Sequence, residues 1–112
     1  MAKPATRAYS RYSREAAKML GAAIRQNRIE RHLTVAELAE RADISRGLVQ
    51  RIERGEMGCA IGAVFELAAI VGIRLFDAGP AAMAGMLKDA ERTLTLLPQA
   101  ARVPGSEVKD DF

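Results

Sequence analysis

Residue types that build catalytic and metal sites are scarce in this chain of 112 residues. It has one cysteine, Cys59, and one histidine, His32, so neither an intramolecular disulfide nor a multi-cysteine metal site can form. A Cys–His catalytic pair would need a third group to orient it. The sequence shows no nucleophile–base set, carboxylate pair or phosphate-binding loop. We therefore expect a protein that is not an enzyme and that uses no metal or cofactor.

Long apolar runs are also missing. No stretch approaches the roughly 20 apolar residues that a membrane-spanning helix needs, and the amino terminus lacks the apolar core of a signal peptide. We expect a cytoplasmic protein with no membrane partner.

Aromatic residues make up only 4% of the chain and tryptophan is absent, whereas hydrophobic residues make up 49%. The core must therefore be built from Ala, Leu, Ile, Val and Met. Ala and Leu are good helix formers, and strands prefer aromatic and β-branched residues. The composition predicts an all-α fold, in a chain long enough for one small domain with short extensions.

Positive charge is concentrated at the amino-terminal end. Residues 1–31 hold eight Lys or Arg against two Glu, a net charge of +6, whereas residues 32–97 have a net charge of −2 and residues 98–112 of −1. A basic segment suits a polyanion such as DNA, although a solvated basic helix face explains the charge equally well.

The first twelve residues, MAKPATRAYSRY, show no helical period and contain Pro4. We expect residues 1–12 to form a flexible basic arm whose cations contact the DNA backbone, namely Lys3, Arg7 and Arg11. Ser13 is a plausible N-cap for the helix that follows. That helix has one face made of Ala17, Leu20, Ile24 and Arg28, in which an arginine is unusual.

The clearest local signal is a pair of short helices with a tight turn between them. Thr34 and Glu37 fit a capping box, with Leu33 and Leu38 as a hydrophobic staple. After Asp43-Ile44-Ser45, Ser45 caps a second helix that ends before Gly55. Two such helices within a bundle of about five describe a helix-turn-helix, which we place within a DNA-binding domain at residues 13–76.

The second helix of the motif would enter the major groove of DNA. Val49 and Ile52 face the core, so the outward positions are Arg46, Gly47, Gln50, Arg51 and Arg54. Arginine pairs bidentately with guanine and glutamine with adenine. Thr34 begins the first motif helix, whose N-terminus is suited to a phosphate.

The end of the DNA-binding domain holds a further apolar helix at about residues 61–71, and Ile73–Phe76 then alternates like a short edge strand. Residues 77–112 lie beyond this domain. Gly79-Pro80 opens another helix, along which Met83, Leu87, Ala90, Leu94 and Leu97 form an apolar stripe. From Pro98 we expect a mobile acidic tail that ends in Phe112.

The run TVAELAERADISRGLVQRIERGE resembles the Cro/C1-repressor (XRE) helix-turn-helix family, and the likeness extends over about Leu20 to Phe76. It implies a five-helix, lambda-repressor-like bundle. It also implies base contacts by Arg46, Gly47 and Gln50, and backbone contacts by Thr34 and Arg51. We add Ser45 to the residues expected to contact bases and Arg54 to those expected to contact the backbone. The resemblance further pairs Arg28 with Glu53, which would give the arginine of the apolar face a partner.

Two positions depart from the family pattern. The family often has Gln where this chain has Val35, so one familiar DNA contact is lost. Gly47 has no side chain, so base readout should depend on its neighbours.

A small helix-turn-helix followed by IRLFDAG, a helix, TLTLLP and the acidic end VKDDF resembles HipB-type antitoxins, which bind DNA and also bind HipA-type kinase toxins. In HipB-like dimers a short strand pairs across the two-fold axis, where Ile73–Phe76 would lie. The resemblance implies a homodimer that represses its own operon and restrains a HipA-like kinase. The dimer and partner contacts would come from Ile73, Leu75, Phe76, Leu87, Leu94 and Phe112. A standalone XRE-family regulator and, less favoured, a protein-bridging adaptor remain alternatives.

Overall fold

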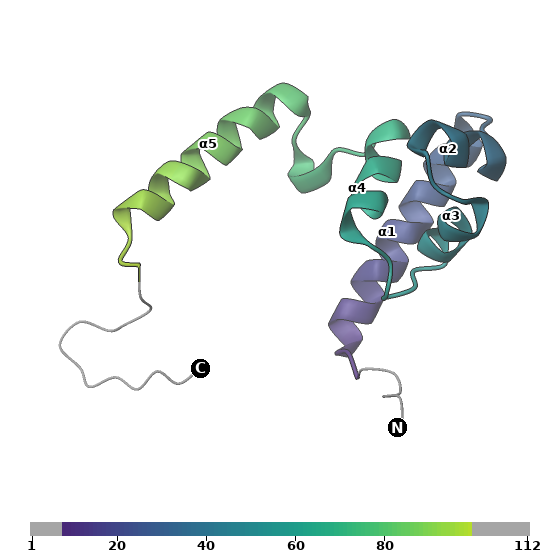
Figure 1. Ribbon diagram of the computed structural model, residues 1–112, viewed down its shortest axis with the longest axis horizontal. Coiled ribbons are helices and arrows are strands. Elements are labelled where there is room, and N and C mark those ends of the chain that lie inside the picture. The colour runs from purple at the N-terminus through teal and green to yellow at the C-terminus, as the bar shows by residue number, and fades with distance from the viewer. Residues whose placement is uncertain (1–7, 100–112) are drawn as a thin grey trace. The chain divides into compact units, whose positions relative to one another are not determined.

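The computed structural model describes residues 8–99. The chain divides into two units, with the boundary between Leu75 and Phe76. The first unit holds four α-helices: α1 (Arg11–Glu30), α2 (Val35–Ala42), α3 (Arg46–Glu53) and α4 (Ile61–Ile70) (Figure 1). The second unit holds α5 (Pro80–Leu96). Among residues 8–99 there are five α-helices and no strand, so the all-α fold predicted from the sequence is confirmed.

The first helix starts earlier than the sequence predicts. Ser10, not Ser13, is the N-cap, and its hydroxyl accepts a hydrogen bond from the Ser13 amide at 3.1 Å. The apolar stripe begins only at Ala17, well inside α1. The polar first turn has no hydrophobic periodicity, so the sequence does not show where the helix begins. Arg11 therefore belongs to α1 and pairs with Glu15 at 3.3 Å, whereas Lys3 and Arg7 lie outside the described residues.

The two motif helices have the predicted caps. Thr34 and Glu37 form a capping box around α2, and the Ser45 hydroxyl accepts a hydrogen bond from the Leu48 amide at 3.0 Å. Between the helices Asp43 adopts a left-handed conformation with φ of 59°. Gly55, after α3, is also left-handed, and its amide and that of Glu56 close the helix on two carbonyls. Both ends of α3 are thus fixed by local hydrogen bonds.

The core of the first unit joins all four of its helices. α3 contacts α1 and α2, and α4 contacts α2. The largest fully buried side chains are Ile24 from α1, Leu38 from α2, Val49 from α3, Leu67 from α4 and Val71 just after α4. Each such aliphatic side chain contributes about 1.5–3 kcal/mol through burial. The core therefore fixes which face of α3 points outward.

Gly21 allows α1 to approach α3 closely. It is buried, and a Cβ at this position would meet the carbonyl oxygen of Ile52 and lie 2.8 Å from that of Glu53. Any larger residue would push the two helices apart. The contact sets the distance across which Arg28 on α1 reaches Glu53 on α3.

The strand predicted at Ile73–Phe76 is wrong for this chain. Leu75–Asp77 forms a short 3₁₀ helix in which Phe76 has φ of 54°, a left-handed value that breaks an extended run. The alternation of apolar residues over four positions is too short to distinguish a strand from a turn. Among residues 8–99 no second strand is present to pair with it.

α5 begins as the sequence predicts, with Pro80 in its first turn after Gly79. Within its own unit the helix buries none of its residues. Leu87 and Leu94, both on the predicted apolar stripe, are more than half exposed. Phe112 and the predicted acidic tail lie outside the described residues. None of the helices within residues 8–99 is long and apolar enough to cross a membrane.

Candidate nucleic-acid interface

The outward face of α3 is polar and basic. Val49 and Ile52 are buried, and the positions between and around them are exposed: Arg46, Gly47, Gln50, Arg51 and Arg54. Ser45, the N-cap, is exposed as well. The structure therefore brings all the predicted residues of this helix to one open surface, with Arg46 and Gly47 in its first turn. These are the positions from which a recognition helix reaches base edges.

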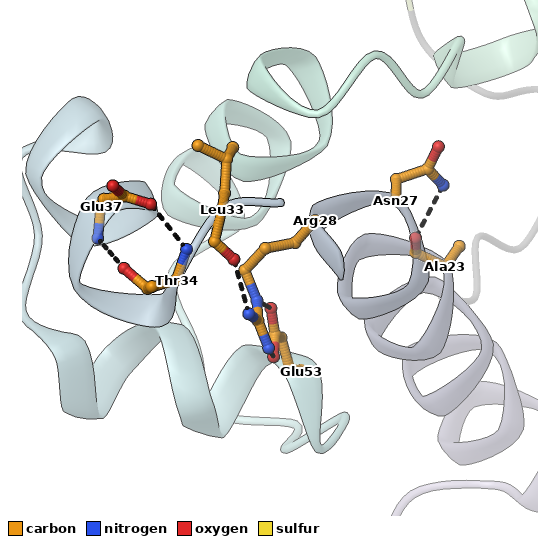
Figure 2. A network of polar contacts seen from close by, with 7 residues as sticks. All are labelled: Ala23, Asn27, Arg28, Leu33, Thr34, Glu37 and Glu53. Carbon is orange, nitrogen blue, oxygen red and sulfur yellow. Dashed lines mark hydrogen bonds and ion pairs between the residues drawn. The ribbon is translucent and has the colours of Figure 1, made fainter. Parts of the chain in front are cut away.

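Thr34 lies at the start of α2, and its polar groups are already partly engaged. Its amide donates to Glu37 Oε1 at 2.9 Å, and its hydroxyl oxygen accepts from the Glu37 amide at 3.0 Å (Figure 2). The Thr34 amide is therefore satisfied within the capping box. A phosphate at this helix end would use the Thr34 hydroxyl proton and the following amides instead.

Arg28 and Glu53 form a two-pronged ion pair beneath this surface. Arg28 Nε lies 2.7 Å from Glu53 Oε2, and Arg28 Nη2 lies 3.1 Å from Oε1. Figure 2 shows the arginine extending from the end of α1 to meet the glutamate of α3. A third bond runs from Arg28 Nη1 to the Leu33 carbonyl at 2.9 Å. With side chains only 11% and 6% exposed, the pair has the partners that buried charges need.

Arg28 also connects the two helices of the motif to α1. Its guanidinium holds Glu53 near the end of α3 and the Leu33 carbonyl just before α2. Its backbone carbonyl accepts from the Leu33 amide at 3.0 Å, which closes the end of α1. One residue thus fixes the starting point of α2 relative to the last turn of α3.

A cleft of about 390 Å³ opens above this pair. Its walls come from three helices and consist of Arg25, Arg28, Val35, Gln50, Glu53 and Arg54. Gln50 and Arg54 were predicted from the sequence to contact DNA, but Arg25 was not. The sequence signal that could have identified Arg25 is its spacing, because it lies three residues before Arg28 and so shares the same side of α1.

At the rim of the cleft, Arg54 already has an ion-pair partner, which a DNA phosphate would have to displace. Its Nη2 lies 3.0 Å from Glu56 Oε2, and both side chains are substantially exposed. Exposed ion pairs of this kind contribute about 0–1 kcal/mol. A phosphate can therefore replace Glu56 at little cost.

The arrangement is that of a helix-turn-helix, and sequence comparison agrees. The family described as "Helix-turn-helix domain" matches residues 19–74, half of the chain. The chain therefore belongs to this family and is a DNA-binding protein of the transcription-regulator class.

One solved structure with a related sequence is the clp gene regulator ClgR from Corynebacterium glutamicum. It is 29% identical, with 70% of this chain and 88% of that chain covered, and the TM-score is 0.48. No curated protein matches the chain.

Proposed function

We propose that this protein is a sequence-specific transcriptional repressor that reads DNA bases with α3. The observation that supports this most directly is the orientation of the helix. Buried Val49 and Ile52 hold one side against the core, which leaves Arg46 and Gln50 exposed on the other. Their side chains suit guanine and adenine respectively. Ser45 and the backbone at Gly47 lie beside them and complete the base-contacting set.

Backbone contacts position that helix on the duplex. We assign them to Thr34, Arg51 and Arg54 in the motif, with Lys3, Arg7 and Arg11 at the amino-terminal end. Arg11 would act from the first turn of α1, where it is exposed and only loosely paired with Glu15. Such contacts fix register and carry most of the salt dependence without reading sequence.

We propose that the protein binds as a homodimer on a two-fold operator. One recognition helix reads only a few base pairs, so selectivity calls for two half-sites about 10 bp apart, centre to centre, or a multiple of that spacing. Because Ile73–Phe76 forms no strand, the dimer contact assigned to Ile73, Leu75 and Phe76 has to use side chains. Footprinting together with light scattering tests this, and a monomer on one asymmetric site would contradict it.

We further propose that the protein is the antitoxin of a HipA-like kinase. α5 supports this, because the helix of 17 residues buries none of its side chains within its unit, whereas most helical stability in proteins comes from the packing of an apolar face. An apolar surface that includes Leu87 and Leu94 would be covered by a partner. Phe112 and the acidic end of the sequence would add a second contact with a basic surface of that kinase.

Purified full chain and a HipA-like kinase from the same operon provide the test. Binding should be lost on Leu87→Asp/Leu94→Asp and weakened when residues 104–112 are deleted, while operator affinity per dimer is retained. A protein that binds its operator but no such kinase is a standalone regulator. A protein that binds kinase or other proteins but no DNA sequence selectively is an adaptor.

A further inference from the structure

The cleft between α1, α2 and α3 has a charge that its internal ion pair does not cancel. Among its lining residues Arg25, Arg28 and Arg54 are cationic and Glu53 is anionic, which leaves a net charge of +2. Glu53 is occupied by Arg28, with both carboxylate oxygens engaged. The remaining positive charge therefore belongs to Arg25 on α1 and to Arg54, which directly follows α3.

Of the three arginines that line this cleft, Arg25 is the one without a hydrogen-bond or ion-pair partner in the described part of the chain. Its side chain is exposed, and within residues 8–99 its guanidinium takes part in no hydrogen bond or ion pair. Arg28, by contrast, is buried and holds three oxygen atoms, and Arg54 is paired with Glu56. All five N–H donors of Arg25 are thus available to a ligand.

The surroundings favour an oxyanion as that ligand. Val35, the first residue of α2, lines the same cleft, so the positive end of that helix borders it. Arginine binds phosphate through two parallel N–H···O bonds. Gln50 also lines the cleft, which places the phosphate site next to a residue that we assign to base reading.

We infer that this cleft binds a phosphate of the DNA backbone and that Arg25 is its principal ligand. The inference rests on the proposed DNA-binding function and adds α1 to the surface that meets DNA. With Arg25 on α1 and Gln50 on α3 lining the same cleft, one bound phosphate would fix how far α3 enters the groove. Arg54 would contribute a second cation once released from Glu56.

The test compares Arg25→Ala with wild type in the full chain, using a random-sequence 30-bp duplex over a range of salt concentrations. Loss of one phosphate contact should weaken binding about fivefold to tenfold at 0.1 M salt. It should also reduce the slope of log K against log salt by about 1. Arg25→Lys, which keeps the charge, should preserve the slope while losing the bidentate geometry.

Arg41→Ala is the matched control. Arg41 is an exposed arginine in the last turn of α2 and does not line the cleft, so its loss changes net charge equally and should leave the slope unchanged. If Arg25→Ala and Arg41→Ala behave alike, the cleft is not a phosphate site, although DNA binding by the wild type still stands. A wild type that binds no duplex would overturn the DNA-binding function itself, and this inference with it.

Discussion

Arg28 and Glu53 lie 25 residues apart in sequence and are joined by two hydrogen bonds of 2.7 and 3.1 Å in a nearly buried site. Because a third bond from Arg28 reaches the Leu33 carbonyl, this pair links the end of α1 to both helices of the motif. Removing either partner leaves the other charge buried and unmatched.

We predict that Arg28→Ala and Glu53→Ala each lower the free energy of unfolding by on the order of 3 kcal/mol. The double change Arg28→Met/Glu53→Leu should recover much of that loss, because two apolar side chains leave no buried charge. Denaturant unfolding of wild type, the two single variants and Arg28→Ala/Glu53→Ala gives the coupling energy. Strictly additive effects would mean that the two side chains do not interact in solution.

Gly21→Ala should destabilise the protein, although alanine is normally the better helix former by about 1 kcal/mol. The added methyl group would collide with the backbone carbonyls of Ile52 and Glu53, and such overpacking typically costs about 1–3 kcal/mol. Gly62→Ala in α4 is the control, because a Cβ there meets nothing within 4 Å. Thermal unfolding should place the two variants on opposite sides of wild type, and equal melting temperatures would contradict the close approach of α1 to α3.

Thr34→Ala should lower stability by about 0.5–2 kcal/mol, because it removes the hydroxyl that accepts from the Glu37 amide. Thr34→Ser keeps that hydroxyl and should stay near wild type. Both variants can be compared by chemical denaturation without DNA. If the alanine and serine variants were equally stable, the Thr34 hydroxyl of the capping box would contribute nothing to the free energy of unfolding.

The local features of the motif could be predicted because their causes are local. A capping box depends on Thr34 and Glu37 at a fixed spacing, and the Ser45 cap depends on its distance from Leu48. Both are visible in the sequence, and both are present. The Arg28–Glu53 pair could be predicted for another reason. A charge on an apolar stripe requires a partner, and the family resemblance indicates which residue it is.

Features that depend on the distance between helices could not be predicted. Nothing about Gly21 in the sequence distinguishes it from Gly62, yet only one of them lies against a neighbouring backbone. Spacing places Arg25 on the same side of α1 as Arg28, but the cleft that gives Arg25 a role exists only when α1 and α3 come together. At Ile73–Phe76 a period of two over four residues predicts a strand, whereas Phe76 is left-handed with φ of 54° and interrupts both an extended run and the short 3₁₀ segment Leu75–Asp77.

Selection of binding sites from a random DNA library tests most directly whether α3 reads sequence. Wild type should enrich a two-fold motif, and Arg46→Ala and Gln50→Ala should each relax one or two positions in every half-site, at a cost of about 1–3 kcal/mol. Arg51→Ala should weaken binding to all sequences alike and leave the motif unchanged. An identical motif from wild type, Arg46→Ala and Gln50→Ala would contradict the assignment of α3 as the recognition helix.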